Sequence, residues 1–268
     1  MSDREPGEQL KKTREKIDLI ERTGCSISQQ EMRQRLLRYA MSARVDKPAE
    51  YVVITGCRST TGFVHLAHFV KLLKHYEVDH TFLSEETCCG NSFLERPDQK
   101  SLGDEMQALE EYARDFEGAN IERVKRLGAK KIVTACAGCY TRYSHFQVNG
   151  DIDVLYYTQL LKKYVDGIHL SATIDFYEGC HKHHRTPTFK IDTKTSRSLL
   201  EGVEALDFSD IPNYCCRDLA DKIYAKATTD TIVTPTSCCW TYLTNQRRSD
   251  SPQVISLTQL MCQALGIA

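Results

Sequence analysis

The chain has 268 residues, a length that corresponds to about one or two domains. Its 35 basic and 36 acidic residues give a net charge of −1, whereas dedicated nucleic-acid binders carry an excess of Lys and Arg. No run of about 18 apolar residues is present, so no membrane span is expected. The charged N-terminus is not typical of a secretory signal. We therefore expect a cytoplasmic protein that binds no nucleic acid.

Cysteine is the unusual component of this composition, with 12 residues in the chain. A chain of this length can build a hydrophobic core without disulfide bonds. Because no export signal is expected, the thiols are predicted to stay reduced and to serve metal or redox chemistry.

The first 50 residues are highly charged and show helical spacing. Apolar positions up to Ile20 predict a first helix, and Gly24 is typical of a helix end. Ser28 and Glu31 form a capping box, which predicts the start of a second helix. The segment is interpreted either as a solvated helical extension or as a docking arm for a partner protein.

From residue 51 onward, short apolar runs alternate with helical patterns. Strands are expected at 51–55, 81–83, 131–134, 154–157, 173–177 and 232–234, and helices at 64–73 and 104–127. Strands that alternate with helices indicate an α/β fold with a largely parallel sheet.

The second half of the sequence repeats the first. Several of the corresponding pairs are 100 positions apart: Ile132 and Ile232, Cys139 and Cys239, Thr158 and Thr258. We therefore predict a helical extension over 1–50 followed by two homologous units, 51–167 and 168–268. Such a duplication predicts pseudo-twofold packing with a shared cleft between the units.

Ten cysteines fall at the expected strand ends, five in each unit. The first set is Cys57, Cys88, Cys89, Cys136 and Cys139, and the second set is Cys180, Cys215, Cys216, Cys238 and Cys239. Soft thiolates in adjacent pairs favour an iron–sulfur cluster. Zinc and a thioredoxin-like dithiol are the alternatives. Cys25 and Cys262 lie outside both sets and are interpreted as ordinary cysteines.

The motifs Gly-Cys, Cys-Cys-Gly and Cys-x-x-Cys, given twice, resemble the CCG domains of the B-type component of heterodisulfide reductases. The matching pieces are ITGC, TCCG, TACAGC and YYTQL in the first unit, and YEGCH, YCCR, TPTSCCW and LTQL in the second. The resemblance implies two Rossmann-like CCG repeats. It also implies a non-cubane [4Fe-4S] cluster on each complete set of five cysteines, with a disulfide reduced or formed between the two clusters.

The second motif departs from this pattern. Arg217 follows its Cys-Cys pair in place of Gly, and Thr236 stands where the first unit has Cys136, with the extra thiol at Cys238. A second non-cubane cluster, a cubane [4Fe-4S] cluster, a zinc ion or an empty site are all open here. We expect His181 and Arg217 to stabilise thiolate or substrate anions, the alternatives being a polar loop and a surface arginine.

The sequence shows neither a nucleotide-binding glycine motif nor a ferredoxin cysteine run, so electrons are expected from other proteins. The expected partners are a ferredoxin-like iron–sulfur subunit and a flavoprotein subunit, in a cytoplasmic complex that can associate with a membrane. The alternative function is a non-catalytic electron-transfer subunit of a succinate/fumarate-, lactate/glycolate- or sulfur-oxidising-type complex. Such a protein would pass electrons to a quinone or a carrier thiol.

Overall fold

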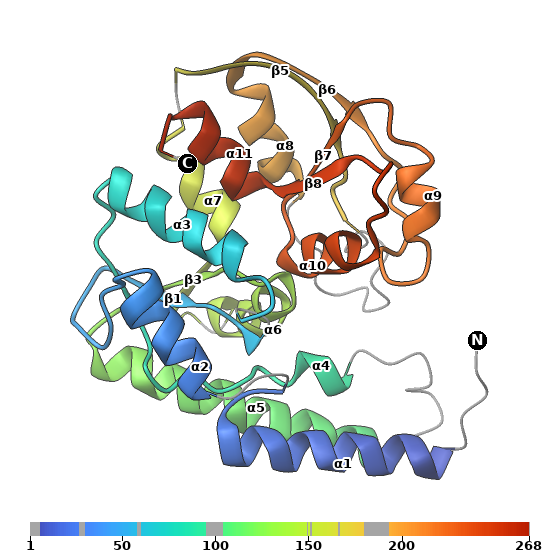
Figure 1. Ribbon diagram of the computed structural model, residues 1–268. Helices are drawn as coiled ribbons and strands as arrows, with labels where there is room; N and C mark the ends of the chain where they lie inside the picture. The colour runs from blue at the N-terminus through green and yellow to red at the C-terminus, as the bar shows by residue number, and fades with distance from the viewer. Residues whose placement is uncertain are drawn as a thin grey trace.

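The computed structural model describes residues 6–26, 30–57, 60–94, 104–148, 150, 152–165, 167–179 and 193–267. Its described part contains two four-stranded parallel sheets, with strand orders β2-β1-β3-β4 and β6-β5-β7-β8 (Figure 1). The two sheets have the same topology, since each strand of the second sheet is numbered four higher than its counterpart in the first. The predicted α/β class with parallel sheets and two Rossmann-like units is therefore confirmed.

The first unit contains the strands β1 (Tyr51–Ile54), β2 (His80–Phe82), β3 (Lys131–Thr134) and β4 (Asp153–Tyr156). Its helices are α3 (Phe63–His75), α4 (Asn91–Leu94), α5 (Asp104–Arg126), α6 (Ala137–Val148) and α7 (Tyr157–Leu161). All four residues of β1 are buried, as is typical of a parallel strand covered by helices on both faces. The strands and helices predicted in this unit are confirmed.

The second unit contains the strands β5 (Ile168–Phe176), β6 (Val203–Asp210), β7 (Thr231–Thr234) and β8 (Gln253–Ser256). Its helices are α8 (Thr193–Glu201), α9 (Ala220–Tyr224), α10 (Ser237–Gln246) and α11 (Leu257–Ala264). Two of these strands, β6 and β8, are absent from the sequence-based expectation, and β5 begins earlier than expected.

The N-terminal segment packs on the first unit. It comprises α1 (Pro6–Thr23), α2 (Gln30–Arg35) and the π-helix η1 (Leu36–Ala40). Figure 1 shows α1 lying alongside α5. Ile17 and Ile20 of α1 are buried in one apolar cluster with Ala113 and Phe116 of α5. As predicted, α1 ends at Gly24, which has a φ of +70°, whereas the predicted cap at 28 lies outside the described residues.

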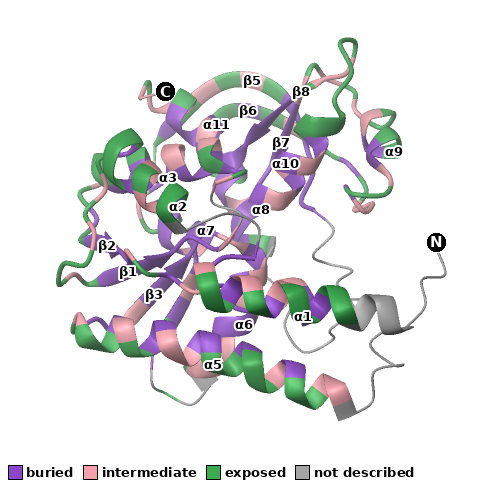
Figure 2. Cartoon of the chain, turned by 60° about the horizontal axis from the view of Figure 1, so that its bottom comes forward, coloured by how far each residue is buried: buried purple, intermediate pink, exposed green. Residues whose placement is uncertain are grey.

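The two units share a continuous hydrophobic core. The helix α11 of the second unit packs against α3 of the first, and α7 of the first packs against α8 of the second. Residues of both sheets, such as Val53 and Val233, belong to the same buried cluster. The strands of the first sheet and the strands β7 and β8 of the second are mostly buried, whereas β6 and the first part of β5 are largely exposed or half-buried (Figure 2). The units are therefore fixed relative to one another, and the pseudo-twofold relation between them stays a prediction.

His65 is buried where α3 meets α11, and it makes stability depend on pH. Its Nδ1 lies 3.2 Å from the Thr258 hydroxyl, and burial lowers the pKa of His65 to about 4. The unfolded chain binds a proton below about pH 6.5, whereas the folded chain does not until about pH 4. Stability is therefore complete above pH 6.5 and is lost as the pH falls toward 4, by about 2 kcal/mol between pH 7 and pH 5.

The measurement is urea unfolding of the wild-type chain and of His65→Asn at pH 7 and pH 5. The variant is expected to lose about 2 kcal/mol less than the wild type over this interval. An equal loss in both proteins would show that His65 is not the titrating group.

Candidate functional site

The first set of cysteines lies at one edge of the first sheet. Cys57 follows β1, Cys88 and Cys89 follow β2, and Cys136 and Cys139 lie at the start of α6, after β3. These three strands are parallel neighbours, so their carboxyl ends meet at the same edge. The predicted convergence of the first set is therefore present in the fold.

The five thiols of this set form a continuous series of contacts. The Cys88 thiol hydrogen-bonds with the thiols of Cys57 and Cys89, and the Cys139 thiol does so with those of Cys89 and Cys136. The Sγ atoms of Cys89 and Cys139 are 3.4 Å apart, well beyond the roughly 2.05 Å of a disulfide bond. The eleven described cysteines form no disulfide with one another. The first set is thus a group of five reduced thiols.

Contacts between the thiols give them different pKa values. Hydrogen bonds from Cys139 and Cys88 lower the pKa of Cys89 to about 7, against the effect of burial. The Cys57 contact lowers the pKa of Cys88, but the Cys89 contact and burial outweigh it and raise this pKa to about 12. The Cys136 and Cys89 contacts together with burial raise the pKa of Cys139 well above its usual value. In the metal-free chain, Cys89 therefore has the lowest pKa of these three thiols.

Two glycines of this site lie so close to neighbouring atoms that a side chain would clash. Gly56 has a φ of +79°, and a Cβ there would lie 2.8 Å from the Cβ of Cys136 and 3.2 Å from the Sγ of Cys139. Gly90 has a φ of +76°, and its Cβ would lie 2.6 Å from the Cβ of Ala113 on α5. Both positions need the left-handed conformation that glycine adopts without steric cost. The backbone conformation and the lack of space for a Cβ therefore explain why glycine occupies these positions in the Gly-Cys and Cys-Cys-Gly motifs.

Buried side chains on α5 and α6 support the Cys88–Cys89 loop. The amide of Asn120 accepts from the backbone N–H of Thr87 at 2.8 Å and donates to its carbonyl at 2.6 Å. It also donates to the hydroxyl of Tyr143, which is completely buried close to Cys89 and Cys139. These contacts fix the loop backbone just before the cysteine pair and exclude water behind it.

Cys25 lies next to the first set, which its position in the sequence does not indicate. Its thiol is buried and donates to the carbonyl of Cys57 at 3.4 Å. The preceding carbonyl of Gly24 accepts from the backbone N–H of Cys88 at 2.8 Å. By contrast, Cys262 is an ordinary buried cysteine of α11, whose thiol donates to the carbonyl of His68 at 3.5 Å.

The second set keeps the central pair of the first. The Sγ atoms of Cys216 and Cys239 are 3.4 Å apart, as are those of the corresponding Cys89 and Cys139. The thiol of Cys215 donates to the carboxylate of Asp218 at 3.3 Å. The fifth predicted member of this set, at position 180, lies outside the described residues.

The departures in the second motif change its local geometry. Thr236 is the buried N-cap residue of α10, so a hydroxyl stands where the first unit has the Cys136 thiol. Arg217 does not share the positive φ of Gly90, and it lies in a turn closed by the N–H of Asp218 on the Cys215 carbonyl at 3.2 Å. The second Cys-Cys loop therefore follows a different path.

The extra thiol of the second set, Cys238, occupies the position of Gly138 in α6. A Cβ at Gly138 would lie 2.6 Å from the Nδ2 of Asn91, so the Asn91 side chain would have to move to admit a larger residue there. The five-thiol arrangement of the first set is therefore not reproduced residue for residue in the second.

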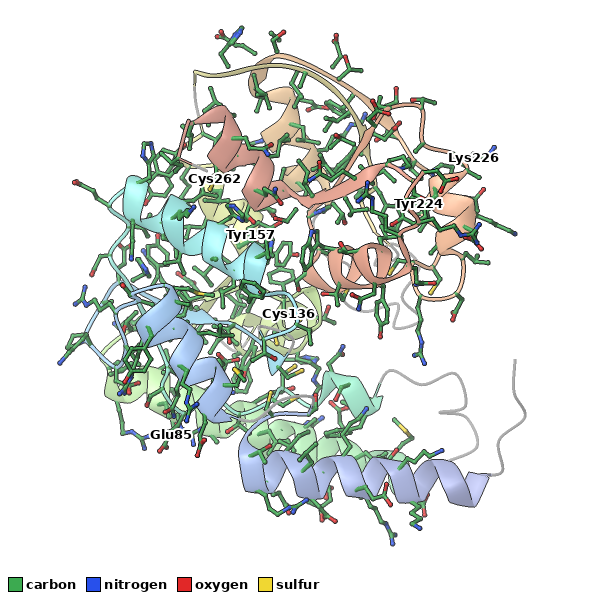
Figure 3. The ribbon with its side chains drawn as sticks, viewed as in Figure 1. Glu85, Cys136, Tyr157, Tyr224, Lys226 and Cys262 are labelled. Carbon is green, nitrogen blue, oxygen red and sulfur yellow. The ribbon has the colours of Figure 1, made fainter. Side chains whose placement is uncertain are left out.

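Tyr156 links the two cysteine sets. Its hydroxyl and that of Tyr157 both donate to the carbonyl of Pro235, at 3.0 and 2.5 Å, just before the start of α10. Burial raises the pKa of Tyr156 well above its usual value, and Cys136 and Cys238 act in the same direction. Figure 3 shows Cys136 at the side of the first unit that faces the second. Two tyrosines of the first unit thus hold the backbone that leads to Cys238 and Cys239 in the second.

Of the two predicted catalytic residues, Arg217 lies among the residues that the structure describes. Arg217 is exposed beside the buried Cys216, which agrees with the alternative interpretation as a surface arginine. The other candidate, at position 181, lies outside the described residues, so its role stays a prediction. The aromatic residues Tyr140 and Trp240 are half-buried, and the Trp240 indole donates to the Val254 carbonyl at 3.2 Å.

The cysteines of the first set form a series of contacts at the sheet edge. Within the described ranges, no three His, Cys, Asp or Glu side chains surround one point as ligands of one ion would. An iron–sulfur cluster distributes its thiolates over several irons, so its ligands need not surround one point. In the part of the chain that the structure covers, no helix is long and apolar enough to cross a membrane.

Comparison with curated proteins finds relatives that are named as iron–sulfur or heterodisulfide reductase proteins. The D-type component of dihydromethanophenazine:CoB–CoM heterodisulfide reductase from Methanosarcina acetivorans is 25% identical over 203 residues, which cover 69% of this chain and 47% of the relative. The same component from Methanosarcina mazei is 31% identical over 113 residues, covering 41% and 25%. An uncharacterized iron–sulfur protein of Methanococcus maripaludis is 23% identical over 151 residues, covering 55% and 28%.

The chain spans less than half the length of these curated relatives. It is similar to D-type components of heterodisulfide reductase, whereas its motifs resemble the B-type component, and the assignment to the B type stays a prediction. No family model matches the sequence. Among solved structures, an aspartate racemase homologue from Pyrococcus horikoshii aligns with a TM-score of 0.37 and 11% identity, covering 81% of this chain and 98% of that one.

Proposed function

We propose that this chain is an iron–sulfur subunit of an oxidoreductase complex, similar to heterodisulfide reductase. The observation that carries the proposal is the first set of five reduced thiols, which contact one another in series at one sheet edge. Its curated relatives are heterodisulfide reductase subunits and iron–sulfur proteins. The proposed cofactor of the first set is a non-cubane [4Fe-4S] cluster.

The residues of the first set suit such a cluster better than they suit zinc or a redox dithiol. Zinc takes about four ligands around one point, and a dithiol needs only Cys136 and Cys139. Cys57, Cys88 and Cys89 would then have no function. When bound, a [4Fe-4S] cluster supplies one-electron oxidation and reduction.

The protein itself holds the ligands and controls their surroundings. Gly56 allows its loop to approach Cys136 and Cys139, and Gly90 allows the Cys88–Cys89 loop to lie against α5. Asn120 fixes the backbone before Cys88. Tyr143 closes the buried side of the site, which lowers its dielectric and strengthens hydrogen bonds to sulfur. Loop geometry, burial and hydrogen bonding are the means by which this chain would set a cluster potential.

The proposed reaction takes place between the two cysteine sets, in one of two directions. A disulfide is reduced with electrons from a ferredoxin-like subunit and a flavoprotein subunit, or a disulfide is formed from two thiols and the electrons pass to those subunits. The position of Tyr156 and Tyr157 supports it, because both hydroxyls hold the Pro235 carbonyl and so fix the second set against the first. A disulfide can be cleaved in one-electron steps when a redox centre stands at each sulfur. The names of the relatives suggest the CoB–CoM heterodisulfide as a test substrate.

The test is EPR spectroscopy of the anaerobically reconstituted chain, oxidised with and without the CoM and CoB thiols. A paramagnetic cluster signal that depends on a thiol is expected if the chain handles a disulfide. A signal that is identical with and without thiols would contradict the disulfide reaction.

The alternative proposal is a non-catalytic electron-transfer subunit, and the second motif favours it. Thr236 in place of a thiol and the different path of the loop at Arg217 weaken the case for a redox centre on both sides of a disulfide. In that case, the EPR signal of the chain is expected to be the same with and without thiols. The reduced cluster is expected to be reoxidised by a soluble quinone analogue.

A further inference from the structure

A buried carboxylate joins the loops that carry Cys57 and Cys88. Glu86 lies two residues before Cys88 and is 1% exposed. Its Oε2 accepts from the backbone N–H of Thr55 at 2.8 Å and from the Thr55 hydroxyl at 2.9 Å. Its Oε1 accepts from the backbone N–H of Gly56 at 2.7 Å. One side chain therefore holds the backbone that immediately precedes Cys57 against the loop that leads to Cys88.

The positive partner of this carboxylate comes from the N-terminal segment. Arg33 of α2 is 1% exposed, and its Nη1 lies 3.9 Å from the Oε2 of Glu86. The same nitrogen donates to the carbonyl of Glu86 at 2.9 Å, and Nη2 donates to the carbonyl of Ser84 at 3.2 Å. Charged groups this deeply buried are kept when they are paired and hydrogen-bonded. Arg33 thus neutralises Glu86 and holds the loop on which Glu86 lies.

The N-terminal segment reaches the same two loops at a second point. The carbonyl of Gly24 accepts from the N–H of Cys88 at 2.8 Å, and the thiol of Cys25 donates to the carbonyl of Cys57 at 3.4 Å. The segment is thereby in direct contact with the backbone of two proposed cluster ligands. This arrangement differs from that of a free docking arm.

We propose that Glu86 and Arg33 are positioning residues that fix the loops of Cys57 and Cys88 for cluster binding. The inference rests on the proposed function, in which the first set holds an iron–sulfur cluster. Partners that orient metal ligands typically change metal affinity or activity by about 10–100-fold when they are replaced. The N-terminal segment is, on this account, part of the first site.

The test compares Glu86→Gln with the wild-type chain after anaerobic reconstitution. The glutamine amide keeps one acceptor oxygen but turns an NH₂ group toward the other donor, so one backbone N–H loses its bond. Iron release to a chelator is expected to be about 10–100-fold faster, and the EPR spectrum of the first cluster is expected to shift. The matched control is Glu50→Gln, an exposed residue before the start of β1 that pairs with Lys131 at 2.7 Å. The control is expected to keep the wild-type release rate and spectrum.

A milder variant covers the case in which Glu86→Gln does not fold. Thr55→Val keeps the side-chain shape and both backbone N–H bonds to Glu86. It removes the hydroxyl bond to Glu86 at 2.9 Å and the longer one to the Gly56 carbonyl at 3.4 Å, so a smaller change in the same direction is expected. If the wild type binds iron and the variants that fold keep its release rate and spectrum, the positioning role is wrong and the proposed function stands. If the wild type binds no iron, the proposed function fails, and the positioning role fails with it.

Discussion

Replacing Cys89 with alanine is expected to abolish iron binding by the first cysteine set while the chain stays folded. Cys89 lies in the middle of the series of thiols, in contact with both Cys88 and Cys139. Its removal separates the Cys57–Cys88 pair from the Cys136–Cys139 pair. Bound iron is expected to fall by about four per chain relative to the wild type.

The matched control for this variant is Cys262→Ala. Cys262 is as deeply buried as Cys89, but it lies on α11, and its thiol contacts the carbonyl of His68. Both replacements remove one buried sulfur and are expected to lower the free energy of unfolding of the metal-free chain by about 1 kcal/mol. Only Cys89→Ala is expected to lose iron. Equal iron content in the two variants would contradict the assignment of the first set.

Gly56→Ala is expected to damage the same site without removing a thiol. The new Cβ would lie 2.8 Å from the Cβ of Cys136 and 3.2 Å from the Sγ of Cys139, so both cysteines have to move. Alanine also costs about 1–2 kcal/mol for the left-handed backbone at a φ of +79°. Iron release to a chelator is expected to be at least about tenfold faster than in the wild type.

Gly128→Ala separates backbone strain from this clash. Gly128 has a φ of +75°, close to that of Gly56, but a Cβ there meets no atom within 4 Å. The variant is expected to lose about 1–2 kcal/mol of stability and to retain all of its iron. If Gly56→Ala and Gly128→Ala retain iron equally, the close approach of Gly56 to Cys136 and Cys139 is not needed by the site.

The strands and helices of the first unit could be predicted from the sequence because each is marked by a local residue pattern. Buried β-branched runs such as Tyr51–Ile54 are followed directly by turn and cysteine motifs, and parallel topology then places the strand ends together. By contrast, β6 (Val203–Asp210) is an edge strand in which most residues are exposed or half-buried. Its charged, weakly apolar pattern is typical of an edge strand and resembles that of a surface loop.

The supporting residues of the site could not be predicted, because their role depends on tertiary contacts. Glu86 and Arg33 are 53 positions apart and belong to stretches rich in charged residues. A single sequence does not distinguish a buried ion pair from two solvated side chains. The position of Cys25 next to Cys57 likewise follows from the packing of α1 on α5, which brings Gly24 and Cys25 onto the cysteine loops.

The central claim is that the first set of cysteines holds an iron–sulfur cluster, and iron and acid-labile sulfide analysis tests it most directly. The anaerobically reconstituted wild-type chain is expected to contain about four irons and a matching amount of sulfide if only the first set is filled. About eight irons are expected if the second set also holds a cluster, and the contribution of the first set is expected to disappear in Cys89→Ala. Less than about one iron per chain, or zinc without sulfide, would contradict the claim.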